Sequence, residues 1–358
     1  MSLSELIGEA LAGLPPLPEQ RKLYVPLAEA IDDYQAWAST PHERVYTGVE
    51  ALDAAMRGTA PGQLTLITGF AHSGKTLFTT KMLLHNPNRR VALFTPDETR
   101  ELILVKLTCA KHGISARRLE QWMTEGNPEG RLMMQETCDA YPTLSVVDAS
   151  VSIPDMERAL GEMAEAWGAP VEAVVFDYAA LLDFGEDIRS KVQALKGFGK
   201  QQRVSMFVLH QASRTSGRDG QVMTMTSGEY GGEKEATHLV GIRRKKSAIQ
   251  ALLREARETL AKPMTSAATR DRLMDVTLPE LEYDLARHEM TITVSLLKNK
   301  TPPCDLVDEL DLLIDPASGR ILGPLESTLP LVKPEQQPSP QAPEVPLTPA
   351  MRALRKDT

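Results

Sequence analysis

The chain contains few cysteines and no long apolar run. Its three cysteines, Cys109, Cys138 and Cys304, are scattered and show no C-x-x-C spacing. This pattern argues against structural disulfides and a zinc site, and it favours a reducing compartment. No apolar stretch is long enough to span a bilayer, and Met1–Leu6 lacks the basic and apolar regions of a secretion signal. We therefore expect a cytoplasmic protein with no membrane partner.

An excess of positive charge is also missing. The chain has 48 acidic and 40 basic residues and a net charge of −8 at pH 7, which argues against a protein that coats nucleic acid with its whole surface. A local basic channel is compatible with this charge, because phosphate contacts need only a few lysines and arginines. Candidates are Arg214, Arg218 and the run Arg243–Lys246. The alternative for that run is a solvated strand end.

What the chain does contain is a phosphate-binding motif. The apolar run Gln63–Thr68 leads into G-x-x-x-x-G-K-T, and Leu77–Leu84 has the pattern of a helix start. Glycines let the backbone turn its amide groups toward phosphates, and a helix N-terminus adds a favourable dipole. Lys75 would reach the β- and γ-phosphates, and the Thr76 hydroxyl would bind Mg²⁺. We predict a nucleoside triphosphate site made of Gly69, Phe70, Ala71, His72, Ser73, Gly74, Lys75 and Thr76.

Carboxylates follow two of the predicted strands. Asp177 ends a buried strand, where a carboxylate can hold the Mg²⁺ shell beside a phosphate loop; the alternative is an Asp that caps the next turn. Asp97 and Glu98 follow the strand that ends at Thr95. Either acid could polarise the water that attacks the γ-phosphate, and the alternative is a cap on the next helix. All three acids are candidate catalytic residues.

Two further features lie at strand ends. Gln211 follows the strand Met206–His210, where a neutral amide can sense the γ-phosphate without adding charge. Lys298 and Lys300 close the strand that begins at Met290, and residues two apart on a strand point to the same face. Such a pair could reach into a neighbouring subunit's triphosphate, where charge develops during phosphoryl transfer. The alternative is a solvated strand end.

Strand and helix patterns alternate along the main part of the chain. This alternation predicts an α/β fold with a mostly parallel central sheet and helices on both faces. We expect an N-terminal segment at 1–44 with a helix at Leu27–Trp37, an ATPase domain at 45–327 with a helical insertion at about 247–288, and a disordered Pro-rich tail at 328–358. The predicted strands are 64–68, 91–95, 144–148, 171–177, 204–209, 238–242 and, nearer an edge, 290–297.

Taken together, the motifs resemble those of the RecA-fold hexameric motors, and most closely the ATPase domain of DnaB-type replicative helicases. The resemblance covers about residues 45–325. It is carried by Thr47–Asp53, Pro61–Gly69, Leu144–Ser150, Asp177–Tyr178, Lys191–Lys200, Phe207–Arg214 and Gly231–Val240.

The resemblance implies a RecA-like core that binds ATP and Mg²⁺ and assembles into a homo-oligomer. In that family the loop at about 213–232 would line a channel for single-stranded DNA, with Arg214, Arg218 and Lys234 as contacts. Gln211 would be the γ-phosphate sensor, and the lysine pair would act in trans. The Leu27–Trp37 helix would be a linker that packs on an adjacent subunit.

Three features depart from the DnaB pattern. The trans-acting motif is Lys298-Asn299-Lys300, as in RecA recombinase, where DnaB helicases usually place Lys and Arg. The register of the catalytic acid is ambiguous between Asp97 and Glu98. The family's N-terminal helical domain is not expected here, since few residues precede Thr47, and small stand-alone versions look phage-like. A phage protein would work in the host cytoplasm.

Three hypotheses of function follow. The first is an ATP-driven motor on single-stranded DNA, a hexameric DnaB-like helicase of DNA replication. The second is a RecA-like recombinase or recombination mediator that forms filaments, because ring and filament differ only in the rotation between subunits. The third is a protein that does not move along DNA: an ATP-switched loader or adaptor, or a small-molecule kinase. The tail, with its basic end Met351–Lys356, could dock replication or recombination proteins.

Overall fold

The computed structural model describes residues 27–178, 185–212, 222, 224 and 232–325. The chain divides into two compact units, residues 1–42 and 43–358. Two predicted DNA contacts, Arg214 and Arg218, lie outside the described residues, and so does the predicted tail at 328–358. No described helix is long and apolar enough to cross a membrane.

The described part of the first unit is helical. A short 3-10 turn, η1 (Leu27–Glu29), leads into α2 (Ala30–Ser39), and η2 (Pro41–Glu43) follows at the boundary between the units. The rings of Tyr34 and Trp37 stack 5.6 Å apart. Leu27, Ile31 and Tyr34 are exposed, and their i, i+4, i+7 spacing places them along one side of the helix.

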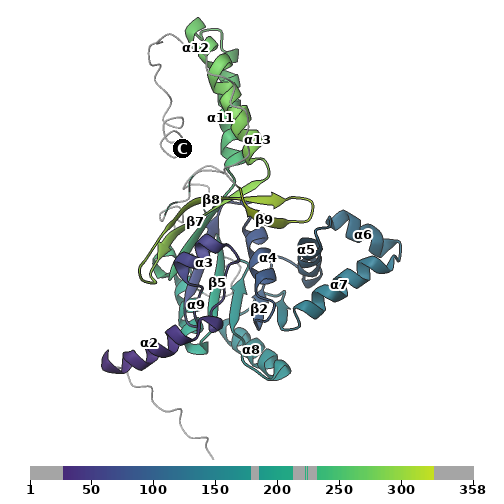
Figure 1. The fold of residues 1–358 in the computed structure, drawn as a ribbon, viewed down its shortest axis with the longest axis vertical. Coiled ribbons are helices and arrows are strands. Elements are labelled where there is room, and N and C mark those ends of the chain that lie inside the picture. The colour runs from purple at the N-terminus through teal and green to yellow at the C-terminus, as the bar shows by residue number, and fades with distance from the viewer. Residues whose placement is uncertain (1–26, 179–184, 213–221, 223, 225–231, 326–358) are drawn as a thin grey trace, which may run out of the picture. The chain divides into compact units, whose positions relative to one another are not determined.

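The second unit is built on a nine-stranded sheet in the order β3-β2-β4-β5-β1-β6-β7-β8-β9. The first six strands in this order are parallel, and the ladders from β6 to β9 are antiparallel. Figure 1 shows the sheet with helices packed around it. The strands are β1 (Leu64–Gly69), β2 (Val91–Phe94), β3 (Leu144–Val147), β4 (Ala173–Phe176), β5 (Ser205–Gln211), β6 (His238–Arg243), β7 (Thr291–Asn299), β8 (Val307–Asp315) and β9 (Arg320–Pro324).

Alternation along the strands divides the core between the two faces of the sheet. On β5, Phe207 and Leu209 join a cluster with side chains of α3, α4 and α5, whereas Met206 and Val208 join a cluster with α8 and α9. Burial of each such side chain contributes about 1.5–3 kcal/mol. The helices are α3 (Glu50–Met56), α4 (Lys75–His85), α5 (Arg100–His112), α6 (Ala116–Thr124), α7 (Pro128–Ala140), α8 (Ile153–Trp167), α9 (Ile188–Gln202) and α10 (Gly232–Glu235).

The predicted fold class is confirmed, and each of the seven predicted strands is present. One expectation needs correction. The strand predicted at 290–297 is β7, and it is not near the edge, because β8 and β9 extend the sheet beyond it. Its first six residues are buried for this reason. The strands β8 and β9 were not predicted, because β8 carries four acidic residues and only partly buries its side chains.

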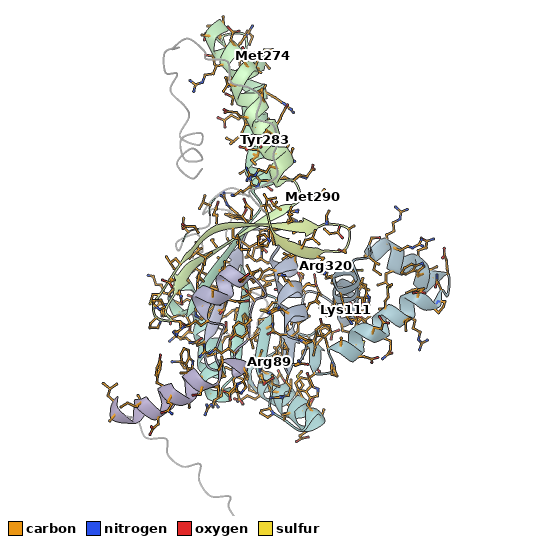
Figure 2. The ribbon with its side chains drawn as sticks, viewed as in Figure 1. Arg89, Lys111, Met274, Tyr283, Met290 and Arg320 are labelled. Carbon is orange, nitrogen blue, oxygen red and sulfur yellow. The ribbon has the colours of Figure 1, made fainter. Side chains whose placement is uncertain are left out.

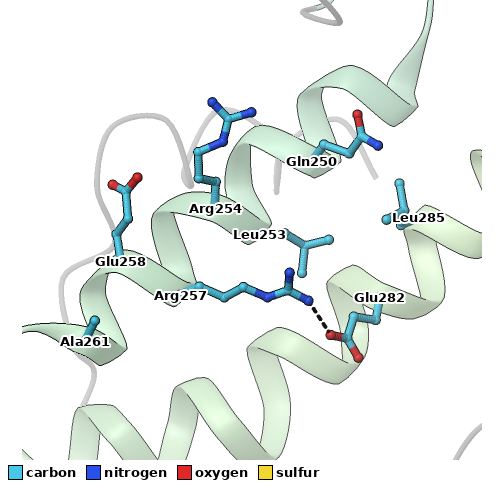
Figure 3. A pocket seen from close by; sticks show the side chains of 8 residues that line it. All are labelled: Gln250, Leu253, Arg254, Arg257, Glu258, Ala261, Glu282 and Leu285. Atoms are coloured by element: carbon cyan, nitrogen blue, oxygen red, sulfur yellow. Dashed lines mark hydrogen bonds and ion pairs between the residues drawn. The ribbon is translucent and has the colours of Figure 1, made fainter.

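A helical arm interrupts the path from β6 to β7. We use this name for residues 245–288, which form α11 (Lys245–Ala261), α12 (Ala267–Arg272), the π-helix η5 (Leu273–Thr277) and α13 (Leu278–His288). Met274 and Tyr283 lie along the arm, and Met290 lies at its root (Figure 2). A shallow groove between α11 and α13 is crossed by an ion pair of 2.9 Å between Arg257 and Glu282 (Figure 3).

Ion pairs fasten the root of the arm to β8. The guanidinium of Arg243, which is 4% exposed, pairs with Glu309 at 2.5 Å. Lys245 pairs with Asp311 at 3.0 Å and with Glu309 at 3.4 Å. Asp311 also accepts a hydrogen bond of 2.6 Å from the Thr293 hydroxyl on β7. Buried, multiply hydrogen-bonded charges hold their geometry tightly, so the root of the arm is a fixed part of the sheet.

Candidate nucleotide-binding site

The predicted phosphate loop, residues 69–76, connects the buried central strand β1 to the N-terminus of α4. His72 has a φ of 59° and Gly74 a φ of 101°, so the backbone turns twice through the left-handed region. This conformation needs no side-chain cap on α4, and none is present. The free amide groups of the first turn of α4 therefore face the concave side of the loop, where an anion would be favoured.

Two glycines are required because the loop packs closely against neighbouring strands. A Cβ atom on Gly69 would lie 2.4 Å from the Ile242 carbonyl oxygen of β6 and 2.4 Å from the Ser73 hydroxyl. A Cβ on Gly74 would lie 2.8 Å from Ile292 on β7. The phosphate loop is thus held between its own strand and the two strands at the root of the arm.

Lys75 folds back across the loop. Its ammonium donates hydrogen bonds of 2.9 Å to the Gly69 carbonyl and 2.7 Å to the Phe70 carbonyl. Burial lowers the pKa of Lys75 to about 8, and the carboxylate of Asp177 acts in the opposite direction. The Ser73 hydroxyl is buried and has no hydrogen-bond partner among the described residues. Lys75 is therefore positioned by the loop itself and is available to a bound anion.

Three carboxylates lie at the ends of β4 and β2. Burial, reinforced by Glu98, raises the pKa of Asp177 to about 6, while Lys106 and Lys75 act against the rise and Asp97 adds the smallest contribution. Glu98 forms an ion pair with Lys106 of α5, and its Oε2 atom is buried without a partner among the described residues. The side chain of Asp97 is exposed. The structure therefore groups Glu98 with Asp177 and turns Asp97 toward solvent.

Gln211 lies directly beside the start of the phosphate loop. It is the register partner of Gly69 across the β1–β5 ladder, and the Ala212 amide donates to the Gly69 carbonyl at 3.0 Å. The preceding His210 is buried, and the part of the chain that the structure describes offers its ring no hydrogen-bond partner. Burial, followed by repulsion from Lys75, lowers its pKa to about 4. His210 is thus neutral at physiological pH and adds no charge to the site.

These residues fit a magnesium–nucleoside triphosphate. The turned loop and the helix N-terminus suit the phosphates, and the unpartnered Ser73 hydroxyl offers a further polar contact. Thr76 and Asp177 supply the hydroxyl and carboxylate oxygens that Mg²⁺ prefers. The described residues contain no cluster of three His, Cys, Asp or Glu side chains that could hold a metal alone.

The two predicted trans-acting lysines lie far from the phosphate loop of their own chain. Lys298 is opposite Leu239 of β6, which is opposite Leu66 of β1. The pair is therefore two strands away from β1, which corresponds to about 10 Å across the sheet. Lys298 is level with Leu66, three residues before Gly69, which corresponds to about 10 Å along the strand. Lys300 lies further still, since its amide donates to the Thr237 carbonyl at 3.1 Å before β6 begins.

Two lysines near these sites were missed by sequence reasoning. Lys106 pairs with Glu98 from the second turn of α5, and Lys196 of α9 donates to the Glu235 carbonyl at 2.6 Å. Lys106 belongs to no motif, and Lys196 lies in Lys191–Lys200, which was singled out only for its resemblance to the family. A helical spacing from Glu98 could have suggested Lys106, but the partner of Lys196 is 39 residues away in the sequence.

Solved structures share this fold. The chain superposes on a structure whose title describes it as an "ATPase Domain", with a TM-score of 0.61 and 15% identity, over 85% of this chain and all of that one. It superposes on a structure titled "The Structure Of A DnaB-Like Replicative Helicase And Its Interactions With Primase" with a TM-score of 0.58 and 17% identity, over 90% of this chain and 71% of that one. The sheet and the phosphate loop define a RecA-like P-loop ATPase domain.

Comparison of the sequence with models of known protein families identifies the family of this chain. Residues 44–227, about half of the chain, match the family model of the DnaB-like helicase C terminal domain, and the chain belongs to this family. Among curated proteins it is similar to the "Replicative DNA helicase DnaB" of Synechocystis sp., with 26% identity over 204 residues. This match covers 53% of the chain and 23% of the relative, so the chain corresponds to about a quarter of that protein's length.

Proposed function

We propose that this protein is an ATP-driven motor on single-stranded DNA, a helicase of the DnaB type that acts in DNA replication. The family relationship supports the reaction. One structural observation supports the mechanism: the phosphate loop follows the carboxyl end of β1, whereas the Lys298–Lys300 pair lies two strands away and toward the amino ends of β1 and β6. A complete site then needs two copies of the chain packed head to tail, which generates a closed ring or a helical filament.

In the proposed site, each chain binds the nucleotide at its own phosphate loop. The amides of residues 69–76 and the ammonium of Lys75 would bind the phosphates of ATP. Thr76 and Asp177 would hold Mg²⁺, which neutralises charge on the phosphates when it is bound. Gln211 would sense the γ-phosphate from its position beside Gly69.

We assign the activation of water to Glu98 rather than to Asp97. Glu98 is partly buried, shares an electrostatic environment with Asp177 and carries one oxygen without a partner among the described residues. Its other oxygen pairs with Lys106, which orients the carboxylate. Asp97 is exposed. Water around an exposed acid weakens its electrostatic interaction with the reacting groups.

The lysine pair completes the site of the neighbouring chain. Within its own chain the pair lies about 10 Å or more from the phosphate loop, both along the strands and across them. We propose that Lys298 and Lys300 instead act on the nucleotide of a head-to-tail neighbour. Cations placed there would stabilise the charge that develops as the γ-phosphoryl group leaves.

Two further parts of the chain support an assembly on DNA. In the first unit, the exposed side of α2 with Leu27, Ile31 and Tyr34 suits a linker that packs on an adjacent subunit. Lys234 is exposed on α10, which directly follows residues 225–231. We propose it as a DNA contact together with Arg214 and Arg218, and we propose a hexameric ring as the assembly.

A RecA-like recombinase is the second candidate, and Lys298-Asn299-Lys300 favours it. Asn299 is buried and donates two 3.0 Å hydrogen bonds, to the carbonyls of Ala55 and Asp305. Asn299 therefore has a structural role in this chain whichever candidate function is correct. Only Lys298 and Lys300 bear on the function.

An unwinding assay on a forked duplex decides between the two candidates. A helicase should displace a strand only with ATP, and Lys75→Ala should abolish displacement. Strand exchange between homologous duplexes without unwinding would establish the recombinase instead. ATP hydrolysis that single-stranded DNA does not stimulate would contradict both.

A further inference from the structure

Three lysine ammoniums gather at the carboxyl end of α10. Lys298 donates to the carbonyls of Glu233 at 2.7 Å and Lys234 at 2.9 Å. Lys300 lies 3.4 Å from the Lys234 carbonyl, and Lys196 donates to the Glu235 carbonyl at 2.6 Å. The last carbonyls of a helix lack partners within the helix, so they accept hydrogen bonds from cations readily. We call Lys196, Lys298 and Lys300 the lysine cluster.

Among the described residues that act on the lysine cluster, positive charges outnumber negative ones. Glu235 is the acid that acts on both Lys196 and Lys298, and it also lies 3.7 Å from Arg189. Burial and the nearby charges of Lys300 and Lys196 lower the pKa of Lys298 to about 8. The pKa of Lys196 is lowered by burial, then by Lys300 and Lys200. Lys196 is therefore electrostatically coupled to both members of the trans-acting pair.

The short helix α10 lies between the pair and α9. A Cβ on Gly232 would lie 3.1 Å from Val192 and 3.2 Å from Ile188, so the start of α10 rests on the first turns of α9. Lys196, one turn beyond Val192, fastens the end of α10 to the same helix. A capping box between Asp187 and Ser190 fixes the start of α9. The helix α10 thus contacts α9 at both of its ends.

We propose that Lys196 is a positioning residue for the trans-acting pair: by holding the end of α10 on α9, it sets where Lys298 and Lys300 stand. This role rests on the function proposed above. Because Lys298 and Lys300 bond to the same turn of α10 that Lys196 holds, a shift of that turn moves all three ammoniums together. Without Lys196, the turn could shift and the pair would no longer be held in place.

Kinetics of the full chain test this role. We expect Lys196→Gln to lower the DNA-stimulated kcat for ATP about fivefold to tenfold, with KM for ATP within about twofold because the lysine cluster does not contact the chain's own phosphate loop. Lys196→Arg should keep most of the activity. Lys200→Gln is the matched control: it removes a lysine one turn further along α9, whose stem would lie 3.7 Å from a Cβ on Gly62 rather than at α10.

The pH profile supplies a readout that a purely structural residue would not move. The groups that act on Lys298 are Lys300, Lys196 of α9 and Glu235 of α10. As pH rises through the pKa of Lys298, its positive charge is lost and kcat should fall. Lys196→Gln removes a like charge and should move this alkaline limb to higher pH, whereas Glu235→Gln removes the attractive charge and should move it lower. Lys196→Arg and Lys200→Gln should leave it in place.

The outcomes separate this role from the function it rests on. If Lys300→Ala slows a DNA-stimulated enzyme but Lys196→Gln matches Lys200→Gln in both kcat and pH profile, the role of Lys196 is wrong and the motor stands. If single-stranded DNA does not stimulate the wild-type protein at all, the motor is wrong and the role of Lys196 falls with it.

Discussion

The two ends of the strands in the sheet carry lysines in opposite electrostatic settings. At the carboxyl end of β1, Lys75 is attracted by the carboxylate of Asp177, on which Glu98 acts in turn. Toward the amino ends of β1 and β6, Lys298 has the like charges of Lys300 and Lys196 beside it, and among the described residues Glu235 is the acid that acts against them. Both lysines have a pKa of about 8, but the first is lowered by burial against an attractive acid, and the second by burial together with repulsion.

This difference shows how one chain can hold two incomplete halves of a site. The carboxyl ends of the parallel strands group acids that would hold a metal ion and a water, while the described residues around the lysine pair carry more cations than acids. Head-to-tail packing would bring the lysine pair of one chain against the nucleotide of the next, where the excess charge is compensated. The predictions below test this division, from the largest expected effect to the smallest.

The acid that activates water should be the most sensitive position. We expect Glu98→Gln to lower kcat for ATP hydrolysis about 10³-fold, within the range of a lost general base. Asp97→Asn, one residue away and exposed, should change kcat less than about threefold. Steady-state ATPase assays of both variants decide the assignment, and equal losses, or a larger loss for Asp97→Asn, would show that the buried acid has been misidentified.

The trans-acting pair should come next. Lys300→Ala should lower kcat about 10²-fold, with nucleotide affinity nearly unchanged when measured by fluorescent nucleotide titration. Mixing Lys300→Ala with Lys75→Ala subunits should restore part of the activity, because each protein keeps the half-site that the other has lost. A mixture that is no more active than its components would mean that both halves belong to one chain.

Replacing Asp177 should stabilise the folded protein but abolish its activity. Its folded pKa of about 6 is above the usual value of 3.8, so folding favours the protonated form and the protein loses stability as pH rises between these values. At pH 8, Asp177→Asn should therefore raise the free energy of unfolding by about 2 kcal/mol, and this gain should vanish near pH 4. Denaturant titrations at both pH values measure the free energy of unfolding, and an ATPase assay measures the loss of activity. A variant less stable than wild type at pH 8 contradicts the raised pKa.

Salt should have the smallest effect. If opposite charges meet across a head-to-tail interface, raising NaCl from about 0.05 to 0.5 M should weaken assembly by about tenfold, because the screening length becomes shorter than the separation of exposed charges. Sedimentation of the nucleotide-free protein measures this change. Assembly that strengthens with salt would indicate an interface formed mainly by apolar contacts, such as those offered by Ile31 and Tyr34.

Much of the fold could be predicted because its signals are local. The strand runs at 64–68 and 204–209 are almost continuously apolar, as buried parallel strands are, and both are present within two residues of the predicted bounds. In contrast, β8 is acidic and only partly buried, and its acids pair with Arg243 and Lys245 from distant positions. No sequence window contains both partners, so β8 could not be recognised as a strand.

The candidate site divides in the same way. The sequence by itself determined the phosphate loop, because a turn between a strand and a helix depends on residues 69–76 and their immediate neighbours. Only the tertiary structure decided that Glu98 is grouped with Asp177 while Asp97 faces solvent, that Lys196 reaches α10, and that the lysine pair lies two strands away from its own phosphate loop. These relations depend on strand order and register, which side-chain contacts across the whole sheet establish, and no local pattern encodes them.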